Sequence, residues 1–283
     1  MKFLVTGALG QLGRVTCEHL ETRGIEVLGT DIPDVPVDDN QRLAATFEAY
    51  RPTHVLHCGA ITDVDGCETD PKLALRVNGE GTANVAALCR SIGAAMVYVS
   101  TDFVFDGTAT QPYRHDDEPC PVSVYGESKL AGERAVLEPA RSNFYVTRTS
   151  WVFGPGGKNF PRAILNRARS GQPLRVVDDQ VGCPSMTRDL AEAIVDLVLS
   201  GADGGVYHMA NEGTCSWHRF ACEILEAAGI RVDVGTMRSA ELDRPAKRPA
   251  YSVLSTSRLA AVRGRTLPDY HDALRRYLEE ELA

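Results

Sequence analysis

Residues 3–13 read FLVTGALGQLG, a short apolar run followed by glycines at positions 7, 10 and 13. The apolar run predicts a strand, and the glycines allow a tight turn in which the backbone comes close to a bound phosphate. The helix that follows would direct free N–H groups and a partial positive charge at the same point. The stretch therefore predicts a dinucleotide-binding turn, although its GxxGxxG spacing also suits an ordinary strand-to-helix turn.

The first half of the chain beyond this turn alternates short apolar runs with helical stretches. Such alternation indicates βα units and a parallel sheet with helices on both faces. The predicted strands are centred on residues 3–5, 27–28, 55–56, 96–99 and 144–147, and the predicted helices cover 11–23, 41–50, 71–92 and 125–138. We therefore expect an α/β fold with a Rossmann-type, doubly wound parallel sheet.

The pattern changes after Trp151, where the sequence GPGG at 154–157 interrupts the alternation. Further helices are predicted near residues 159–169, 187–200, 216–228 and 268–281, joined by irregular segments that contain proline. We expect a dinucleotide-binding domain at 1–150 and a smaller, mainly substrate-binding α/β subdomain at 151–283. For part of residues 186–212, the alternative is that the chain returns to the first domain.

Composition limits the classes of partner. The 283-residue chain carries a formal net charge of −8, which argues against a nucleic-acid or anionic-membrane partner. Its eight cysteines form no CxxC pair, so no zinc site or redox motif is indicated and no metal is predicted. Scattered thiols and an incomplete signal-peptide pattern predict a cytoplasmic protein. His54 and His57 lie three apart in a predicted strand, and we assign them to structure.

Tyr125 and Lys129 lie four residues apart in a predicted helix, so their side chains share one face. A free phenol has a pKa of about 10, and a neighbouring ammonium lowers that pKa by stabilising the phenolate. The pair therefore predicts a proton donor and the cation that tunes it. The other interpretation is a half-buried aromatic residue beside a solvated lysine.

Two predicted strand ends supply further candidate residues. Thr101 and Asp102 follow the fourth strand, at the sheet edge where doubly wound folds bind ligands, and a hydroxyl there can meet the Tyr125 phenol. Asp31 ends the second strand, where a carboxylate can accept from both ribose hydroxyls and repel a 2′-phosphate. This favours NADH over NADPH, while a loop acid without a cofactor role is the alternative.

The whole chain resembles the dTDP-4-dehydrorhamnose reductases, a family of extended short-chain dehydrogenase/reductases. The matching motifs, in family order, are TGALGQLG at 6–13, TDVDGCE at 62–68, VN at 77–78, STDFVFDG at 100–107, YGESKLAGE at 125–133, RTSWVFG at 148–154, NF at 159–160, VDDQVGCPS at 177–185 and RPAYSVL at 248–254. The YxxxK and glycine motifs mark only the superfamily, whereas WVFG, DDQVG and RPAYSVL are more specific. Phe103 replaces a frequent tyrosine and Ser185 a usual threonine, and both changes leave the chemistry intact.

The resemblance implies a role for each matched position. The implied cofactor contacts are Gly7, Gly10, Gln11, Leu12 and Gly13 at the pyrophosphate, Asp31 at the adenosine ribose, Ala60, Ile61 and Thr62 at the middle of the dinucleotide, and Tyr125 and Lys129 at the nicotinamide ribose. The implied substrate contacts are Thr101, Asp102, Trp151, Asn159, Gln180 and Arg248. The implied catalytic residues are Tyr125, Lys129 and Thr101.

The implied reaction is the reduction of dTDP-4-dehydro-6-deoxy-L-mannose to dTDP-L-rhamnose by hydride from NADH or NADPH, for polysaccharide biosynthesis. Tyr125 would protonate the alkoxide, Lys129 would lower the phenol pKa, and Thr101 would orient the carbonyl. Three alternatives stay open: another nucleotide-sugar 4-ketoreductase, an epimerase, or a non-catalytic subunit like the regulatory subunit of methionine adenosyltransferase. Some relatives bind magnesium at a subunit interface, but no acids can be mapped to such a site here. A homodimer is left open.

Overall fold

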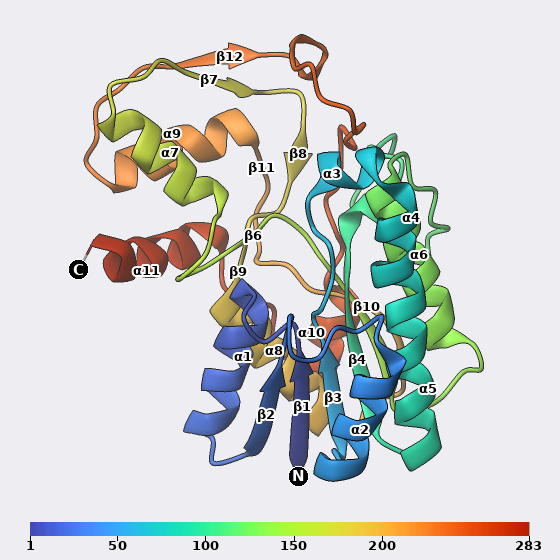
Figure 1. Ribbon diagram of the computed structural model, residues 1–283. Coiled ribbons are helices and arrows are strands. Elements are labelled where there is room, and N and C mark those ends of the chain that lie inside the picture. Colours follow the sequence, from blue (N-terminus) through green and yellow to red (C-terminus); the bar gives the residue numbers. More distant parts are fainter. Residues whose placement is uncertain (283) are drawn as a thin grey trace.

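A sheet of six parallel strands is the central feature of the computed structural model, which describes residues 1–282 and leaves Ala283 outside (Figure 1). In spatial order the strands are β10 (Gly205–His208), β5 (Phe144–Thr149), β4 (Ala95–Thr101), β3 (His54–His57), β1 (Lys2–Thr6) and β2 (Glu26–Thr30). β1 pairs with β2 on one side and β3 on the other, so the strand order reverses there. In such sheets a ligand crevice forms beyond the carboxyl ends of the strands at this point. The predicted fold class is confirmed.

Helices cover both faces of this sheet (Figure 1). One layer contains α1 (Gln11–Thr22), α8 (Thr187–Leu199) and α10 (Ser257–Arg263), and the other contains α2 (Asn40–Tyr50), α5 (Thr82–Ile92) and α6 (Val124–Leu137). Val15 and Leu20 of α1 pack with Leu190 and Ile194 of α8 in the first core, and Leu43, Val85 and Val136 lie in the second. Burial of these side chains, worth about 1.5–3 kcal/mol each, fixes the helices on the sheet.

The predicted helix at 71–92 is continuous in the structure but not uniform. It begins as α4 (Pro71–Ala74), widens into a π-helical segment at Leu75–Gly81, and continues as α5. Asp70 caps the start by accepting a hydrogen bond from the Leu73 N–H at 3.0 Å. The π-helical segment was not predicted, because its hydrophobic pattern does not differ from that of an α-helix.

A smaller lobe stands over the carboxyl ends of the strands (Figure 1). It contains α7 (Phe160–Arg169), α9 (Trp217–Ala227), α11 (Tyr270–Leu282), and three short strand pairs: β7 (Leu174–Val177) with β12 (Val234–Met237), β8 (Val181–Gly182) with β11 (Cys215–Ser216), and β6 (Val152–Phe153) with β9 (Ser185–Met186). Phe153, Phe220, Tyr270 and Tyr277 form the centre of its core. The lobe places side chains above the crevice of the sheet.

His57 has a structural environment, as expected. Its ring nitrogens lie 2.6 Å from Thr6 Oγ1 and 3.0 Å from Thr82 Oγ1, and burial lowers its pKa to about 3. His54 stacks on Phe3 with ring centroids 4.8 Å apart. Among residues 1–282 there is no cluster of three or more side chains arranged to hold a metal, and no helix has the length and apolar character needed to cross a membrane.

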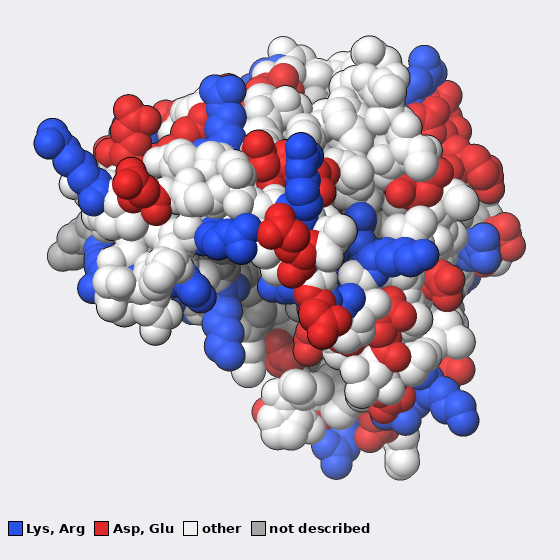
Figure 2. Space-filling view, turned by 90° about the horizontal axis from the view of Figure 1, so that it is seen from above, with Lys and Arg blue, Asp and Glu red and all other residues white. Residues whose placement is uncertain are grey.

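The surface above the small lobe mixes both signs of charge. Figure 2 shows Lys and Arg side chains interspersed with Asp and Glu across this face. Such alternation does not create the extended basic surface that binding to a nucleic-acid backbone requires.

Candidate active site

The glycine turn between β1 and α1 has a geometry that only glycine permits at two positions. Gly7 has a φ of +71°, and a Cβ on it would lie 2.6 Å from the Gly59 nitrogen. A Cβ on Gly13 would lie 2.2 Å from the Gly7 carbonyl oxygen. No side chain caps the N-terminus of α1 at Gly10, so its first N–H groups are available to an anion. This turn therefore has the properties of a pyrophosphate site.

A cavity of about 670 Å³ opens at this turn and extends along the carboxyl ends of the strands. Most of the predicted site residues line it: Gly7, Gly10, Gln11, Leu12, Gly13, Asp31, Ala60, Thr62, Thr101, Asp102, Tyr125, Lys129 and Trp151. These residues come from α1, α6 and the segments at the carboxyl ends of β1 to β5, which the parallel sheet brings to a single edge. We refer to this space as the cofactor cavity.

α6 presents Tyr125 and Lys129 on the wall of the cofactor cavity. The helix begins after Ser123, whose side chain accepts a hydrogen bond from the Gly126 N–H at 3.2 Å. Gly126 and Gly132 allow α6 to approach its neighbours, since a Cβ would lie 2.2 Å from the Phe103 carbonyl oxygen and 2.5 Å from the Tyr98 hydroxyl, respectively. This close packing holds both side chains in a fixed position.

The charge of Lys129 is not directed at the phenol. Its Nζ donates to the Val99 carbonyl oxygen at 2.8 Å and lies 4.2 Å from the centre of the Tyr98 ring. Burial lowers the pKa of Lys129 to about 7. Burial raises the pKa of Tyr125, and the neighbouring Thr101 side chain offsets this only in part. The prediction of a lowered Tyr125 pKa is therefore wrong, because the pKa is raised. The phenol stays protonated and so can donate a proton.

Thr101 and Asp102 lie beside this phenol at the end of β4. The Thr101 hydroxyl donates to Asp102 Oδ1 at 3.1 Å and accepts from the Phe103 N–H at 3.2 Å. Burial raises the pKa of Asp102 to about 6. Its Oδ2 is buried without a hydrogen-bond partner among the described residues, which makes it available to a ligand.

Asp31 stands at the opposite end of the cofactor cavity. Its carboxylate accepts from the Leu9 N–H at 2.7 Å and from the Ile32 N–H at 2.8 Å, so the glycine turn itself fixes its orientation. The guanidinium of Arg42 donates to the carbonyl oxygens of Pro33 and Asp34, in the segment that directly follows Asp31. Lys129 and Lys158 are the cationic side chains among the described residues that line this cavity.

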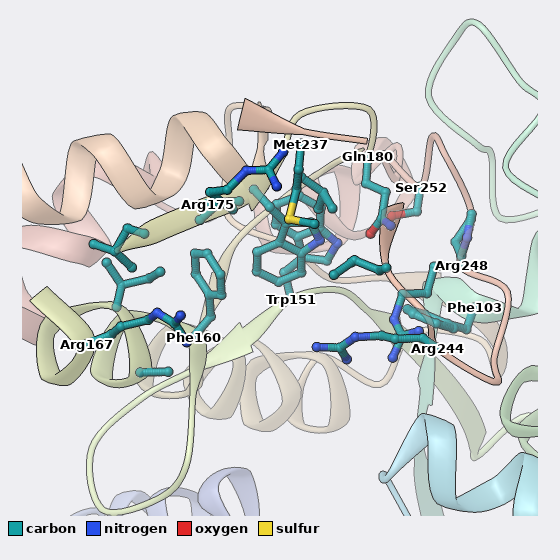
Figure 3. A pocket seen from close by; sticks show the side chains of 18 of the residues that line it. Phe103, Trp151, Phe160, Arg167, Arg175, Gln180, Met237, Arg244, Arg248 and Ser252 are labelled. Carbon is teal, nitrogen blue, oxygen red and sulfur yellow. The ribbon is translucent and has the colours of Figure 1, made fainter. Parts of the chain in front are cut away.

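A second cavity, also about 670 Å³, lies under β7 and β12 of the small lobe, and we call it the arginine cavity (Figure 3). Predicted residues Trp151, Gln180 and Arg248 line it together with Phe160 and Trp217. Four arginines also line it: Arg167, Arg175, Arg244 and Arg248. Flat aromatic surfaces next to guanidinium groups suit a ligand with a ring and an anionic group.

Trp151 stands where the two cavities meet. Its φ of +46° is unusual for a bulky residue, and its indole stacks on Trp217 with centroids 3.5 Å apart and planes 6° from parallel. Phe103, Trp151 and Trp217 line both cavities. Gly182 provides the room, since a Cβ there would lie 2.4 Å from the Trp151 ring. The cofactor cavity and the arginine cavity therefore share an aromatic wall.

Two predicted site residues lie outside both cavities. Asn159 is the N-cap of α7: its Oδ1 accepts from the Arg162 N–H and the Tyr277 hydroxyl, and its Nδ2 donates to Gly154 O. The backbone N–H of Ile61 donates to Asn78 Oδ1 at 2.8 Å. The Asn159 side chain thus makes its hydrogen bonds at the N-terminus of α7. The Ile61 backbone is bound to Asn78, at the contact between the loop at 60–62 and the π-helical segment.

Sequence reasoning did not identify Trp217, Lys158 or Asn78. Trp217 begins α9 and belongs to no motif that carries chemistry. Lys158 lines the cofactor cavity because the loop before α7 lies against α1, where the Gln11 amide donates to the Lys158 carbonyl oxygen at 2.6 Å. Asn78 belongs to the VN motif at 77–78, which carries no role of its own in the sequence. Its role depends on a contact between segments that are distant in the chain.

Comparisons with known proteins agree with this geometry. The family model described as RmlD substrate binding domain matches residues 1–283. The chain is 41% identical to the spore coat polysaccharide biosynthesis protein SpsK of Bacillus subtilis, covering 99% of this chain and 97% of that protein. It is 40% identical to dTDP-4-dehydrorhamnose reductase of Streptomyces griseus, covering 92% and 87%. The dTDP-4-dehydrorhamnose reductase of Bacillus anthracis, solved in complex with NADP, has a TM-score of 0.94 at 33% identity and covers 99% and 100%.

Proposed function

Because this chain belongs to the RmlD family of dTDP-4-dehydrorhamnose reductases, we propose that it reduces the C4 ketone of dTDP-4-dehydro-6-deoxy-L-mannose to give dTDP-L-rhamnose, with NAD(P)H as reductant. The observation that carries this proposal is the junction of the two cavities at Phe103, Trp151 and Trp217. There a ketosugar can reach Tyr125 while its nucleotide extends into the arginine cavity. The product would serve polysaccharide biosynthesis.

The residues present fit a bound dinucleotide. A Cβ would fill the cradle at Gly7 and Gly13, and the N-terminus of α1 has no side-chain cap. Lys129 lines the same cavity beyond the turn, where it can hold the nicotinamide ribose. When bound, NAD(P)H supplies the hydride.

The side chains around the ketone supply the proton that the reduction requires. Hydride addition to C4 turns the carbonyl oxygen into an alkoxide, and the buried Tyr125 phenol, held protonated, gives that oxygen its proton. The resulting phenolate lies one helical turn from the Lys129 ammonium and recovers a proton from water. With substrate bound, the Thr101 hydroxyl turns from Asp102 to donate to the same oxygen, which places that oxygen at the phenol before transfer.

The ribose end of the cofactor cavity favours NADH. Asp31 is fixed there by two backbone N–H groups, and the guanidinium of Arg42 donates to the carbonyl oxygens of Pro33 and Asp34. A 2′-phosphate would meet a carboxylate, and no arginine among residues 1–282 lines this cavity. The NADP complex of the Bacillus anthracis relative makes the comparison of both cofactors essential.

A coupled assay that generates the labile dTDP ketosugar in place tests the proposal. The wild-type chain should oxidise NADH with a higher kcat/KM than NADPH. Tyr125→Phe should lower kcat at least about 100-fold, the usual scale for loss of a general acid, while the Kd for NADH stays within about twofold. Tyr145→Phe is the matched control. The Tyr145 hydroxyl donates to the Ala202 carbonyl oxygen, at the amino end of β5 and away from the cofactor cavity.

Other outcomes identify the rival functions. Near-wild-type turnover by Tyr125→Phe would remove the proton-donor role. An epimerase would give no net NADH oxidation, and another 4-ketoreductase would give a product of different stereochemistry by NMR. A non-catalytic subunit would leave NADH unoxidised under every condition.

The cellular site that fits best is the cytoplasm. All eight cysteines are free thiols, and burial raises the pKa of several of them, which keeps them unreactive. Unpaired thiols are typical of a reducing compartment.

A further inference from the structure

Asp65 lies in the first turn of the short helix α3 (Val64–Thr69) and binds a segment far away in the chain. Its Oδ1 accepts from Arg248 Nη1 at 3.2 Å and from the Ala246 N–H at 3.2 Å. Its Oδ2 accepts from Arg248 Nη2 at 2.9 Å and from Arg244 Nη1 at 3.3 Å. The Asp65 carboxylate thus accepts four hydrogen bonds from residues 244–248. The hydrogen bond from Arg248 is the largest cause of the lowered pKa of Asp65.

The way in which Asp65 holds Arg248 leaves one edge of the guanidinium free. The two terminal nitrogens face the carboxylate end-on, and Nη1 also donates to Ala246 O at 3.0 Å. The Nε–H and the second Nη2–H, which together form the side edge of the guanidinium, have no acceptor among the described residues. That edge has the spacing that binds two oxygens of a phosphate.

Arg248 is well placed to use this free edge. Its side chain is 16% exposed and lines the arginine cavity near Phe103 and Ser252. Figure 3 shows Arg244 and Arg248 next to each other by Phe103, on the opposite side of the cavity from Arg167. A long arginine side chain without a fixed partner would lose rotamer freedom on binding an anion, whereas Arg248 is already oriented.

We propose that Asp65 is a positioning residue for the anionic part of the substrate: it fixes Arg248 end-on and so presents the side edge of the guanidinium to a nucleoside diphosphate in the arginine cavity. This inference rests on the proposed function for the identity of the anion. It adds a residue on the sheet side of the crevice that acts on the nucleotide without touching it.

Asp65→Asn in the full-length chain tests this role, with dTDP and thymidine as binding probes measured by titration calorimetry or competition. Asn keeps the size but loses the charge and one acceptor oxygen. The Kd for dTDP should rise about tenfold, the scale of one charge-assisted contact, while thymidine and NADH affinities stay within about twofold. Asp63→Asn is the matched control, because Asp63 caps the same helix through the Gly66 N–H and Asn caps equally well.

A double-mutant cycle separates positioning from mere packing. In an Arg248→Gln background, Asp65→Asn should have a much smaller effect on dTDP binding, because only its contacts with Arg244 and the Ala246 N–H remain to be weakened. Equal losses for dTDP and thymidine would mean a general structural role and would overturn the inference. Tighter dTDP binding by Asp65→Asn would also overturn it, since Asp65 would then compete with the anion. If the wild type binds dTDP but shows no reductase activity, the proposed function fails. The dTDP affinities of the Asp65 and Arg248 variants still test the role of Asp65.

Discussion

Lys129 shows at the residue scale how burial sets chemistry. Among the described residues, the ammonium has one hydrogen-bond acceptor and one aromatic face as partners, and this is too little to replace its hydration. Its pKa consequently falls to about 7. Near neutral pH the side chain is therefore poised between charged and neutral forms. A bound dinucleotide and a developing phenolate would both favour the charged form.

Lys129 should make the stability of the ligand-free protein depend on pH in a defined direction. The unfolded chain holds this proton up to a pKa near 10.4, whereas the folded protein releases it near 7, so the unfolded state binds more protons between these values. The free energy of unfolding of the wild type relative to Lys129→Met should therefore rise with pH, by roughly 2 kcal/mol from pH 7 to pH 9. Urea denaturation at several pH values measures it.

Lys72→Met serves as the control for this titration, because Lys72 is exposed on α4. It should show no comparable change with pH. A constant difference between wild type and Lys129→Met over pH 7–9 would mean that Lys129 keeps its ordinary pKa in the folded protein.

At the element scale, the π-helical segment at Leu75–Gly81 connects the loop at residues 60–62 to α6. Its Asn78 is fully buried, accepts from the Ile61 N–H at 2.8 Å, and donates to the Ile61 carbonyl oxygen at 3.0 Å and to Ser128 Oγ at 2.9 Å. One amide thus ties the loop at 60–62 to α6. π-Helical turns often occur where a side chain must be redirected for function.

Replacing Asn78 by Ala should weaken both the fold and the cofactor site. The substitution removes three hydrogen bonds and leaves the buried polar groups of Ile61 without partners, which should cost about 3 kcal/mol. The Kd for NADH should rise because the loop at 60–62 loses its anchor. Urea denaturation and NADH fluorescence titration measure the two effects. Asn84→Ala, on α5, removes a single 3.4 Å contact and should be nearly neutral.

Over the whole molecule, the chain crosses between the large sheet and the small lobe several times. α8 and β10 return to the sheet after the first passage through the small lobe, and α10 returns after the second. Arg276 of α11 then binds Asp189 of α8 at 2.8 Å and joins the two parts. The division at residue 150 stays a prediction, but a single cut there does not separate two complete cores.

A fragment of residues 1–150 should therefore not fold cooperatively by itself. It lacks α8, whose Leu190, Ile194 and Val198 cover α1 and one face of the sheet, and it lacks the edge strand β10. Exposure of this apolar face should produce strong binding of a hydrophobic dye and a broad thermal transition by circular dichroism, with the full-length chain as reference. A sharp transition in the fragment would show that residues 1–150 form an independent domain.

The sequence was sufficient for features that depend on local pattern. The strands β1 to β5 and the helices of the first half lie within a few residues of the predicted positions, because hydrophobic period and glycine placement act over short distances. The glycine turn and the Tyr125–Lys129 pair also follow from local spacing, since a helix brings residues four apart onto one face. The substrate class came from motif resemblance rather than from periodicity.

Only the tertiary structure decided the features that depend on contacts between distant segments. The direction of the Lys129 charge, the raised pKa of Tyr125, the stacking of Trp151 on Trp217, and the hold of Asp65 on Arg248 each join parts of the chain that no local pattern connects. The structure also shows that Asn159 caps α7, while its contact with the substrate stays a prediction. Spacing in the sequence thus determined which residues can take part in the site. Burial and packing determined which groups each side chain contacts and in which protonation state it is held.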